Sequence, residues 1–168
     1  YREEYINKLQ KNIEKIIPKL TNEKEKLNIK YKTKFVDKEK FLKDLKLNLN
    51  NDLYRGYTGI GVHRDDFELF VNGRELNLYG SQGQHRTAIL ALKFAEMEII
   101  KEEVSENPIL LLDDITSELD LERLNLIFQK IKEYQVIITC TDANIIRNFD
   151  SLTNEIKLYK ICNGRLDT

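Results

Sequence analysis

Four consecutive apolar residues, Ile109 to Leu112, place the strongest constraint on the fold of this chain. A short and continuous apolar run is typical of a strand that is buried on both faces of a parallel sheet. An amphipathic helical pattern follows over residues 121–134, and a second apolar run over residues 135–140 predicts a second buried strand. Strand, helix and strand in this order predict an α/β layer.

The first third of the chain predicts helix, strand and helix. Apolar residues recur at helical spacing over residues 1–20, and Pro18 is expected to end that helix. Residues 27–36 alternate between apolar residues and lysines, which is typical of a strand with one solvated face. Helical spacing returns after Asp37, which is expected to cap the helix, and continues to about residue 53.

Two Asn-Gly dipeptides predict tight turns. Asn72 and Gly73 divide two alternating segments within residues 67–79, which predicts a β-hairpin, and residues 155–166 predict a final strand and turn. Between them, residues 84–103 carry a helical apolar stripe that widens in its first half. That half is expected to be buried nearly all round.

Two adjacent acids, Asp113 and Asp114, directly follow the first apolar strand. Carboxylates at the carboxyl end of a central strand lie where α/β sheets bind ligands. Asp113 could orient Mg²⁺, which prefers one or two carboxylates together with water and phosphate oxygens. Asp114 could orient a water molecule aimed at a phosphate. The alternative is that both acids only cap the turn that follows.

A polar turn, Ser81-Gln82-Gly83-Gln84, opens the long helix. In one interpretation Ser81 only caps that helix. In the other, the Ser81 side chain and the Gly83 amide meet a phosphate, because the dipole at a helix N-terminus favours an anion. The turn by itself leaves both interpretations open.

The order of these segments resembles that of the ATP-binding-cassette ATPases. The polar turn matches their signature motif, residues 109–114 match their Walker B strand, and Ser117-Glu118-Leu119-Asp120 matches their D-loop. Within that superfamily, GVHRDDFELFVNG, GSQGQHRTAILALKFAE and PILLLDDITSELD resemble the RecF family of bacterial DNA replication and repair proteins. The match is close over about residues 56–141.

The resemblance implies a fold and its domains. Residues 54–168 would form the C-terminal half of an ATP-binding-cassette domain, with a mixed sheet and flanking helices. Residues 1–53 would be the end of a helical lobe and its return into the ATPase domain. No GxxxxGK[ST] phosphate-binding loop occurs here, and in the family it lies near the N-terminus. Because the chain also begins without methionine, we expect a C-terminal fragment that is inactive alone. Without further strands, residues 109–112 are expected to be partly exposed or to drive self-association.

The same resemblance implies roles for the residues. In this superfamily the signature motif reaches across a head-to-tail dimer to the ATP of the other subunit, so the Ser81–Gln84 turn would contact nucleotide in trans. Asp113 would serve Mg²⁺ and Asp114 the attacking water, with slow hydrolysis because aspartate is one methylene shorter than the usual glutamate. Ser117 and Asp120 would lie at the dimer seam.

Two positions depart from the general pattern. Cassette ATPases carry a switch histidine after the strand that matches residues 135–140, whereas this chain has Thr-Cys-Thr-Asp there, and Thr141 is the candidate substitute. The family usually has proline before the His-Arg pair, where this chain has Val62.

Three basic residues are further candidates. His63 and Arg64 would contact DNA, the dimer partner or nucleotide; the alternative is a pair at the hairpin entry, with Arg64 bridged to Asp65 or Asp66. Arg86 would face a phosphate or solvent.

The resemblance also implies a function for the intact protein. It would bind double-stranded DNA as an ATP-dependent homodimer, help to load recombinase at gaps, and work in DNA repair, replication and the SOS response with RecO- and RecR-type partners. Two alternatives remain: another SMC-like ATPase head, or an interaction module that keeps the fold without using nucleotide.

Composition sets looser limits. With 27 Lys and Arg against 28 Asp and Glu, bulk charge favours neither nucleic acid nor membrane. The lysine-rich residues 24–46 would meet a DNA backbone or be solvated. No apolar run approaches the roughly 20 residues that span a bilayer. Two widely spaced cysteines argue against a zinc site and indicate a reducing, cytoplasmic setting.

Overall fold

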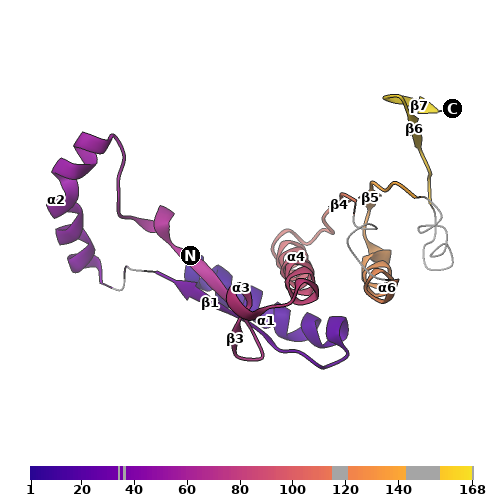
Figure 1. The fold of residues 1–168 in the computed structure, drawn as a ribbon, viewed down its shortest axis with the longest axis horizontal. Coiled ribbons are helices and arrows are strands. Elements are labelled where there is room, and N and C mark those ends of the chain that lie inside the picture. Colours follow the sequence, from indigo (N-terminus) through magenta and orange to yellow (C-terminus); the bar gives the residue numbers. More distant parts are fainter. Residues whose placement is uncertain (34, 36, 115–120, 143–155, 168) are drawn as a thin grey trace. The chain divides into compact units, whose positions relative to one another are not determined.

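The structure is a computed structural model that describes residues 1–33, 35, 37–114, 121–142 and 156–167 (Figure 1). It combines helices and sheets, as the predicted α/β class requires. Its contacts form two compact units, Tyr1–Ile99 and Ile100–Thr168. The expected domain boundary before residue 54 stays a prediction. The expected D-loop residues, Ser117 and Asp120, lie outside the described residues.

The first unit opens with helix α1, Arg2–Thr21. Its buried side chains form one stripe: Leu9, Asn12, Ile13, Ile16 and Ile17. The prediction that Pro18 ends the helix was wrong, because a proline loses its own N–H but keeps its carbonyl. That carbonyl accepts a hydrogen bond from the amide of Asn22, which ends the helix in a left-handed conformation.

A three-stranded antiparallel sheet packs against α1. Strand β1, Leu27–Lys32, pairs with β2, Asp66–Val71, from Leu27 opposite Val71 to Lys32 opposite Asp66. The predicted alternation is confirmed, since Leu27 and Ile29 are buried, whereas Asn28, Lys30 and Lys32 are exposed. The strand stops at Lys32, not at residue 36, because its partner strand begins at Asp66.

Helix α2, Lys38–Arg55, lies between these two strands in the sequence. The predicted cap is confirmed, because the Asp37 carboxylate accepts a hydrogen bond from the Glu39 amide at 3.0 Å. Gly56 ends the helix with a φ of 73°. None of the described side chains of α2 is buried.

The predicted hairpin forms at Asn72-Gly73, with φ values of 50° and 80° that suit a type I′ turn. Its second strand, β3, covers only Arg74–Glu75, and residues 76–79 form the one-turn helix α3, Leu76–Tyr79. The alternation in residues 74–79 therefore predicted too long a strand. The chain turns away from the sheet because the Gly80 amide bonds to the Leu76 carbonyl, and Leu76 is buried.

Helix α4, Gln82–Val104, begins in the first unit and is the longest element. Its buried residues are Thr87, Ala88, Ala91, Phe94, Ala95, Met97 and Ile99. The expectation that its first half is buried nearly all round was wrong, since Ile89 is 57% exposed. Ile89 lies outside the stripe of Ala88, Ala91 and Ala95, because each residue advances the helix by about 100°.

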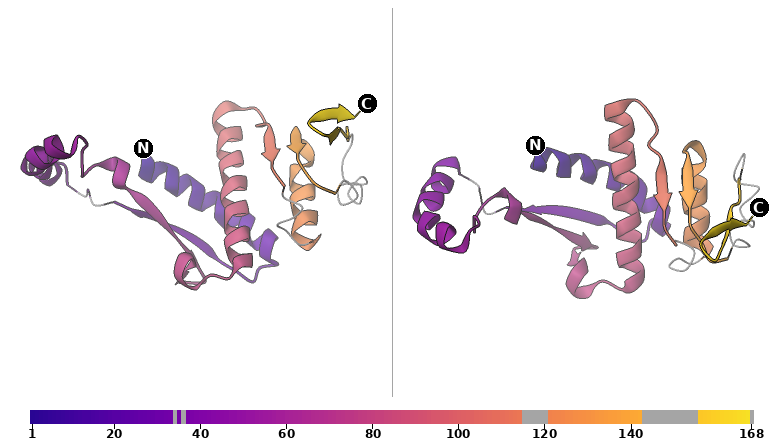
Figure 2. Two further views of the ribbon diagram at one scale, coloured as in Figure 1. Left: turned by 45° about the horizontal axis from the view of Figure 1, so that its top comes forward. Right: turned by 90° about the horizontal axis from the view of Figure 1, so that it is seen from above.

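The second unit contains the predicted strand–helix–strand element (Figure 2). Strand β4, Leu110–Leu112, pairs in parallel with β5, Val136–Ile138. Helix α6, Leu121–Lys130, and the short helix η2, Ile131–Glu133, lie between them in the sequence. Helix α6 is drawn alongside the strand pair in both views of Figure 2.

Burial of both strand faces was predicted and is not observed. Leu111 and Ile137 lie opposite each other in the parallel ladder and are 71% and 55% exposed. A helix such as α6 can cover only one face of the β4–β5 pair. Successive side chains of a strand point to opposite faces, so Leu111 and Ile137 lie on the other face. The expected partial exposure of residues 109–112 is confirmed.

The described chain ends in a second hairpin. Strand β6, Lys160–Cys162, pairs with β7, Arg165–Asp167, across Asn163-Gly164. The predicted strand and Asn-Gly turn are confirmed, with φ values of 51° and 73°. No helix in the described part of the chain is long and apolar enough to cross a membrane.

The two Asn-Gly turns allow a matched test. Asn72 Oδ1 accepts a hydrogen bond from the Lys26 amide at 2.9 Å, whereas the Asn163 side chain has no hydrogen bond to another described residue. Both asparagines have similar positive φ values, so replacement by alanine costs both turns the same backbone strain. We expect Asn72→Ala to lower the free energy of unfolding by about 1 kcal/mol more than Asn163→Ala does. Equal losses in urea titrations would contradict this.

Candidate functional site

Ser81 and Gln84 cap helix α4 reciprocally. The backbone amide of Gln84 donates to Ser81 Oγ at 3.2 Å, and the backbone amide of Ser81 donates to Gln84 Oε1 at 3.0 Å. This capping box satisfies amides that a helix N-terminus otherwise leaves without a partner. The capping role of Ser81 is therefore confirmed. It does not exclude a phosphate contact, because a serine hydroxyl that accepts one bond can still donate another.

Gly80 precedes this turn because no side chain fits there. A Cβ would lie 2.5 Å from the Leu76 carbonyl oxygen, 2.5 Å from Leu76 Cδ1 and 3.2 Å from His85 Nε2. Its φ of −74° is open to any residue, so the close approach alone requires glycine. Helix α3 thus packs directly against residues 81–84, the signature turn.

The connector between α1 and β1, residues 22–26, holds the turn from the other side. Gln84 Nε2 donates to Glu25 Oε1 at 2.9 Å, so both ends of that side-chain amide are engaged. The hairpin tip holds the same connector, since Lys26 and Asn72 exchange two hydrogen bonds of 2.9 Å. Segments far apart in the sequence therefore fix the position of the turn.

The turn itself faces outward. Ser81 and Gln82 are exposed, and Gly83 is half-buried. Amides in the first turn of a helix, here those of Gln82 and Gly83, have no carbonyl of their own helix to which they can donate. At the N-terminus of a helix of 23 residues, such amides and the helix dipole together favour an anion.

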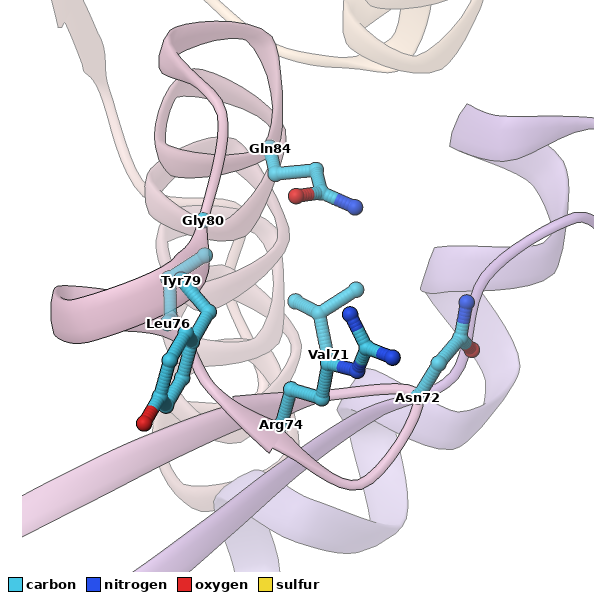
Figure 3. A pocket seen from close by; sticks show the side chains of 7 residues that line it. All are labelled: Val71, Asn72, Arg74, Leu76, Tyr79, Gly80 and Gln84. Carbon is cyan, nitrogen blue, oxygen red and sulfur yellow. The ribbon is translucent and has the colours of Figure 1, made fainter.

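A cavity of about 400 Å³ opens beside the turn (Figure 3). The hairpin tip, α3 and the start of α4 line it through Val71, Asn72, Arg74, Leu76, Tyr79, Gly80 and Gln84. The exposed Arg74 guanidinium and the exposed Tyr79 ring are its strongest recognition groups. Guanidinium groups bind phosphate oxygens, and aromatic rings stack on bases.

In the second unit, Thr139 links the two acids. The Asp114 amide donates to Thr139 Oγ1 at 3.0 Å, and the Thr139 hydroxyl donates to Asp113 Oδ1. The Thr139 amide continues the β4–β5 ladder by donating to the Leu112 carbonyl at 3.0 Å. Asp114 has a φ of 46°, a left-handed conformation that aspartate tolerates better than most residues. The carboxyl end of β4 is therefore a defined turn.

The acid pair offers a donor set that suits Mg²⁺ held jointly with a nucleotide. Asp113 and Asp114 are both exposed. Among the described residues, no group of three or more His, Cys, Asp or Glu could form a cation site by itself. Mg²⁺ is commonly bound by one or two carboxylates together with phosphate oxygens and water, and the Asp113 carboxylate fits that requirement.

His63 lies in the short helix η1, Val62–Arg64, and its ring is held locally. His63 Nε2 lies 2.9 Å from the Thr58 carbonyl oxygen. The ring also lies over Gly61, where a Cβ would come within 2.8 Å of His63 Nδ1. These contacts give His63 a structural role whether or not it touches a ligand.

Arg64 is exposed, and within the described residues it forms no ion pair with Asp65 or Asp66. The predicted bridge is therefore absent there. Asp65 instead accepts a hydrogen bond from the Tyr31 hydroxyl, which raises the pKa of Tyr31.

Two other predicted residues lie where the sequence placed them. Arg86 is half-buried in the first turns of α4, and Thr141 is exposed beyond the end of β5. The turn and Arg86 belong to the first unit, and Asp113, Asp114 and Thr141 belong to the second.

Sequence reasoning missed Thr139 and Glu25. The signal for Thr139 was a hydroxyl group near the carboxyl end of the second predicted strand.

Comparison with known proteins gives one consistent result. The chain is 42% identical to RecF, the DNA replication and repair protein of Clostridium beijerinckii, over 98% of its own length and 46% of that protein. It is 43% identical to RecF of Clostridium tetani over 97% of its own length and 46% of that protein. No protein-family model matches. The chain is RecF-like.

Solved structures agree. The recombination mediator protein RecF of the RecFOR pathway, in a form named RecF-ATP, covers 99% of this chain at 35% identity and a TM-score of 0.71. The shared part is 44% of that structure. An SMC ATPase structure, at 16% identity and a TM-score of 0.54, shows the same fold only. This RecF-like chain is thus α/β and similar in fold to part of RecF, and it spans about 46% of the curated relatives' length.

The capping box predicts a stability effect of Ser81. We expect Ser81→Ala to lower the free energy of unfolding by about 1 kcal/mol, because the Gln84 amide loses its acceptor. The matched control is Ser105→Ala, at the exposed far end of α4. Urea titrations in which both variants match the parent chain would contradict a stabilising cap.

Gly80 yields a second prediction. Gly80→Ala should destabilise the chain by about 2 kcal/mol, because the Leu76 carbonyl must move away from the new methyl group. Adding Leu76→Ala removes the clash with the Leu76 side chain but leaves the clash with the Leu76 carbonyl. The double variant is therefore not expected to regain the lost stability. Thermal unfolding that shows no loss for Gly80→Ala would indicate that α3 is not packed against the turn.

Proposed function

We propose that this chain is the C-terminal part of a RecF-like protein that binds ATP between two subunits and acts on double-stranded DNA in recombinational repair. The observation that carries the proposal is the outward-facing signature turn, in a chain that resembles RecF over nearly its whole length. Its ordered acid pair at the end of a parallel strand supports the same chemistry.

In the proposed dimer, the signature turn binds the γ-phosphate of ATP held by the other subunit. The Ser81 hydroxyl and the Gly83 amide are the groups best suited to donate hydrogen bonds to that anion. Gln82 is exposed beside them. Gln84 acts through its engaged side chain, which holds the turn in place.

The acid pair serves the subunit's own nucleotide in this proposal. Mg²⁺, when bound, neutralises charge on the β- and γ-phosphates. Asp113 would hold that cation, and Asp114 would orient the attacking water. Thr141 is the proposed switch residue. Ser117 and Asp120 are the proposed residues of the dimer seam. Hydrolysis is expected to be slow, because the short Asp114 side chain reaches less far than a glutamate.

DNA binding is proposed for the basic residues of the first unit. His63, Arg64 and the lysines of residues 24–46 would contact phosphates, which attract such side chains regardless of sequence. Arg86 would contact either nucleotide or DNA. RecO- and RecR-type proteins are the proposed partners, and the proposed setting is the cytoplasm, in DNA repair, replication and the SOS response.

Specific observations favour two other functions. Ser81 and Gln84 already satisfy each other in the capping box, as in an interaction module that no longer uses nucleotide. Similarity in fold to an SMC ATPase is compatible with another SMC-like head.

Reconstitution tests the proposal. The chain is co-expressed with the upstream half of the proposed longer protein, and Mg²⁺-dependent ATP hydrolysis is measured. We expect slow turnover that needs both halves and falls at least about a hundredfold in Asp114→Asn and Ser81→Arg, because each removes a group that acts on the γ-phosphate.

Ser105→Arg, the same substitution at the far end of α4, serves as the control and should retain turnover. A folded pair without turnover, or turnover indifferent to Asp114→Asn and Ser81→Arg, would contradict the ATPase assignment. It would then favour the interaction module.

A further inference from the structure

We propose that Thr139 is a positioning residue that holds both acids of the candidate catalytic pair through one hydroxyl group. The inference deepens the proposed function and rests on it, since it assigns Thr139 to the binding of the nucleotide's divalent cation. Neither acid alone fixes this arrangement, because the hydroxyl comes from the residue that follows the neighbouring strand β5.

Strand register brings the three residues together. Strands β4 and β5 pair in parallel, with Leu112 opposite Ile138. The residues that follow at the carboxyl ends are Asp113 and Thr139, and the Thr139 amide still bonds to the Leu112 carbonyl at 3.0 Å. The side chain of Thr139 is therefore anchored by its own backbone before it contacts either acid.

The hydroxyl acts as donor and acceptor at once. It accepts from the Asp114 amide at 3.0 Å and donates to Asp113 Oδ1. A hydroxyl has a single proton, so once that proton is given to a carboxylate its orientation is fixed. A bond from a neutral donor to a charged carboxylate is also stronger than one between neutral groups.

The consequence differs for the two acids. Asp113 is held through Oδ1, so its carboxylate cannot rotate freely, and its other oxygen keeps its full capacity to accept or to bind a cation. Asp114 is held through its backbone, at a φ of 46°, so the turn that carries its side chain is fixed instead. Removing one hydroxyl would loosen both acids together.

Thr141 offers the internal comparison. It is exposed two residues further along, and within the described residues it makes no hydrogen bond to either acid. By sequence pattern Thr141 was the residue expected near the nucleotide, whereas the contacts select Thr139. The two threonines therefore make opposing predictions.

The test measures cation binding separately from turnover. In the full-length protein that contains this chain, Mn²⁺ binding in the presence of a non-hydrolysable ATP analogue is followed by electron paramagnetic resonance. We expect Thr139→Val, which keeps the shape and loses the hydroxyl, to weaken Mn²⁺ binding about tenfold, as removal of a group that hydrogen-bonds to a metal ligand commonly does. Thr139→Ser should restore binding.

Two further measurements separate positioning from folding. Binding of the analogue in EDTA should be equal in the parent protein and in Thr139→Val, and the unfolding midpoint confirms that the variant is folded. If Thr139→Val does not fold, Thr139→Ala takes its place.

The outcomes are distinct. Normal Mn²⁺ binding by a folded Thr139→Val protein, or a loss in Thr141→Val alone, overturns the inference and leaves the proposed function standing. A parent protein that binds neither the analogue nor Mn²⁺ overturns the proposed function, and this inference with it.

Discussion

The parallel pairing of β4 and β5 is the constraint on which the chemistry of the second unit depends. In a parallel pair the carboxyl ends of both strands lie at one edge, so polar residues that follow each strand meet there. Asp113 and Thr139 meet for this reason, and the turn at Asp114 is tied to the same hydroxyl. A slip of one residue would replace Thr139 by Ile138 or Cys140, and the acids would lose their partner.

The first unit reaches the same degree of order by a different route. Its signature turn is held by a capping box within α4, by the tight approach of α3 at Gly80, and by the contact between Gln84 and Glu25. None of these is a strand register. The first two are local, and the contact between Gln84 and Glu25 joins segments that the β1–β2 sheet and its hairpin bring together. Through that contact the turn depends on the correct formation of the sheet, although it lies outside it.

The parts of the fold that could be predicted are those whose cause is local in the sequence. Alternation in residues 27–32, both Asn-Gly turns and the strand–helix–strand order depend on short-range periodicity and backbone conformation. The contact between Glu25 and Gln84 spans 59 positions, and that between Thr139 and Asp113 needs the register of two strands. No local pattern encodes either. The exposed face of β4 and β5 could be foreseen only because two strands without neighbouring strands leave apolar side chains uncovered.

The pairing of β1 with β2 has a consequence for how such a chain can change. The last pair joins Lys32 to Asp66, so everything between them leaves and re-enters the sheet at one point. That segment includes α2, none of whose described side chains is buried. Each doubling of a flexible segment's length adds only about 0.6 kcal/mol to the entropic cost of closing it. Evolution can therefore lengthen, shorten or exchange this excursion, and a protein engineer can insert a reporter there, while the register behind it stays unchanged.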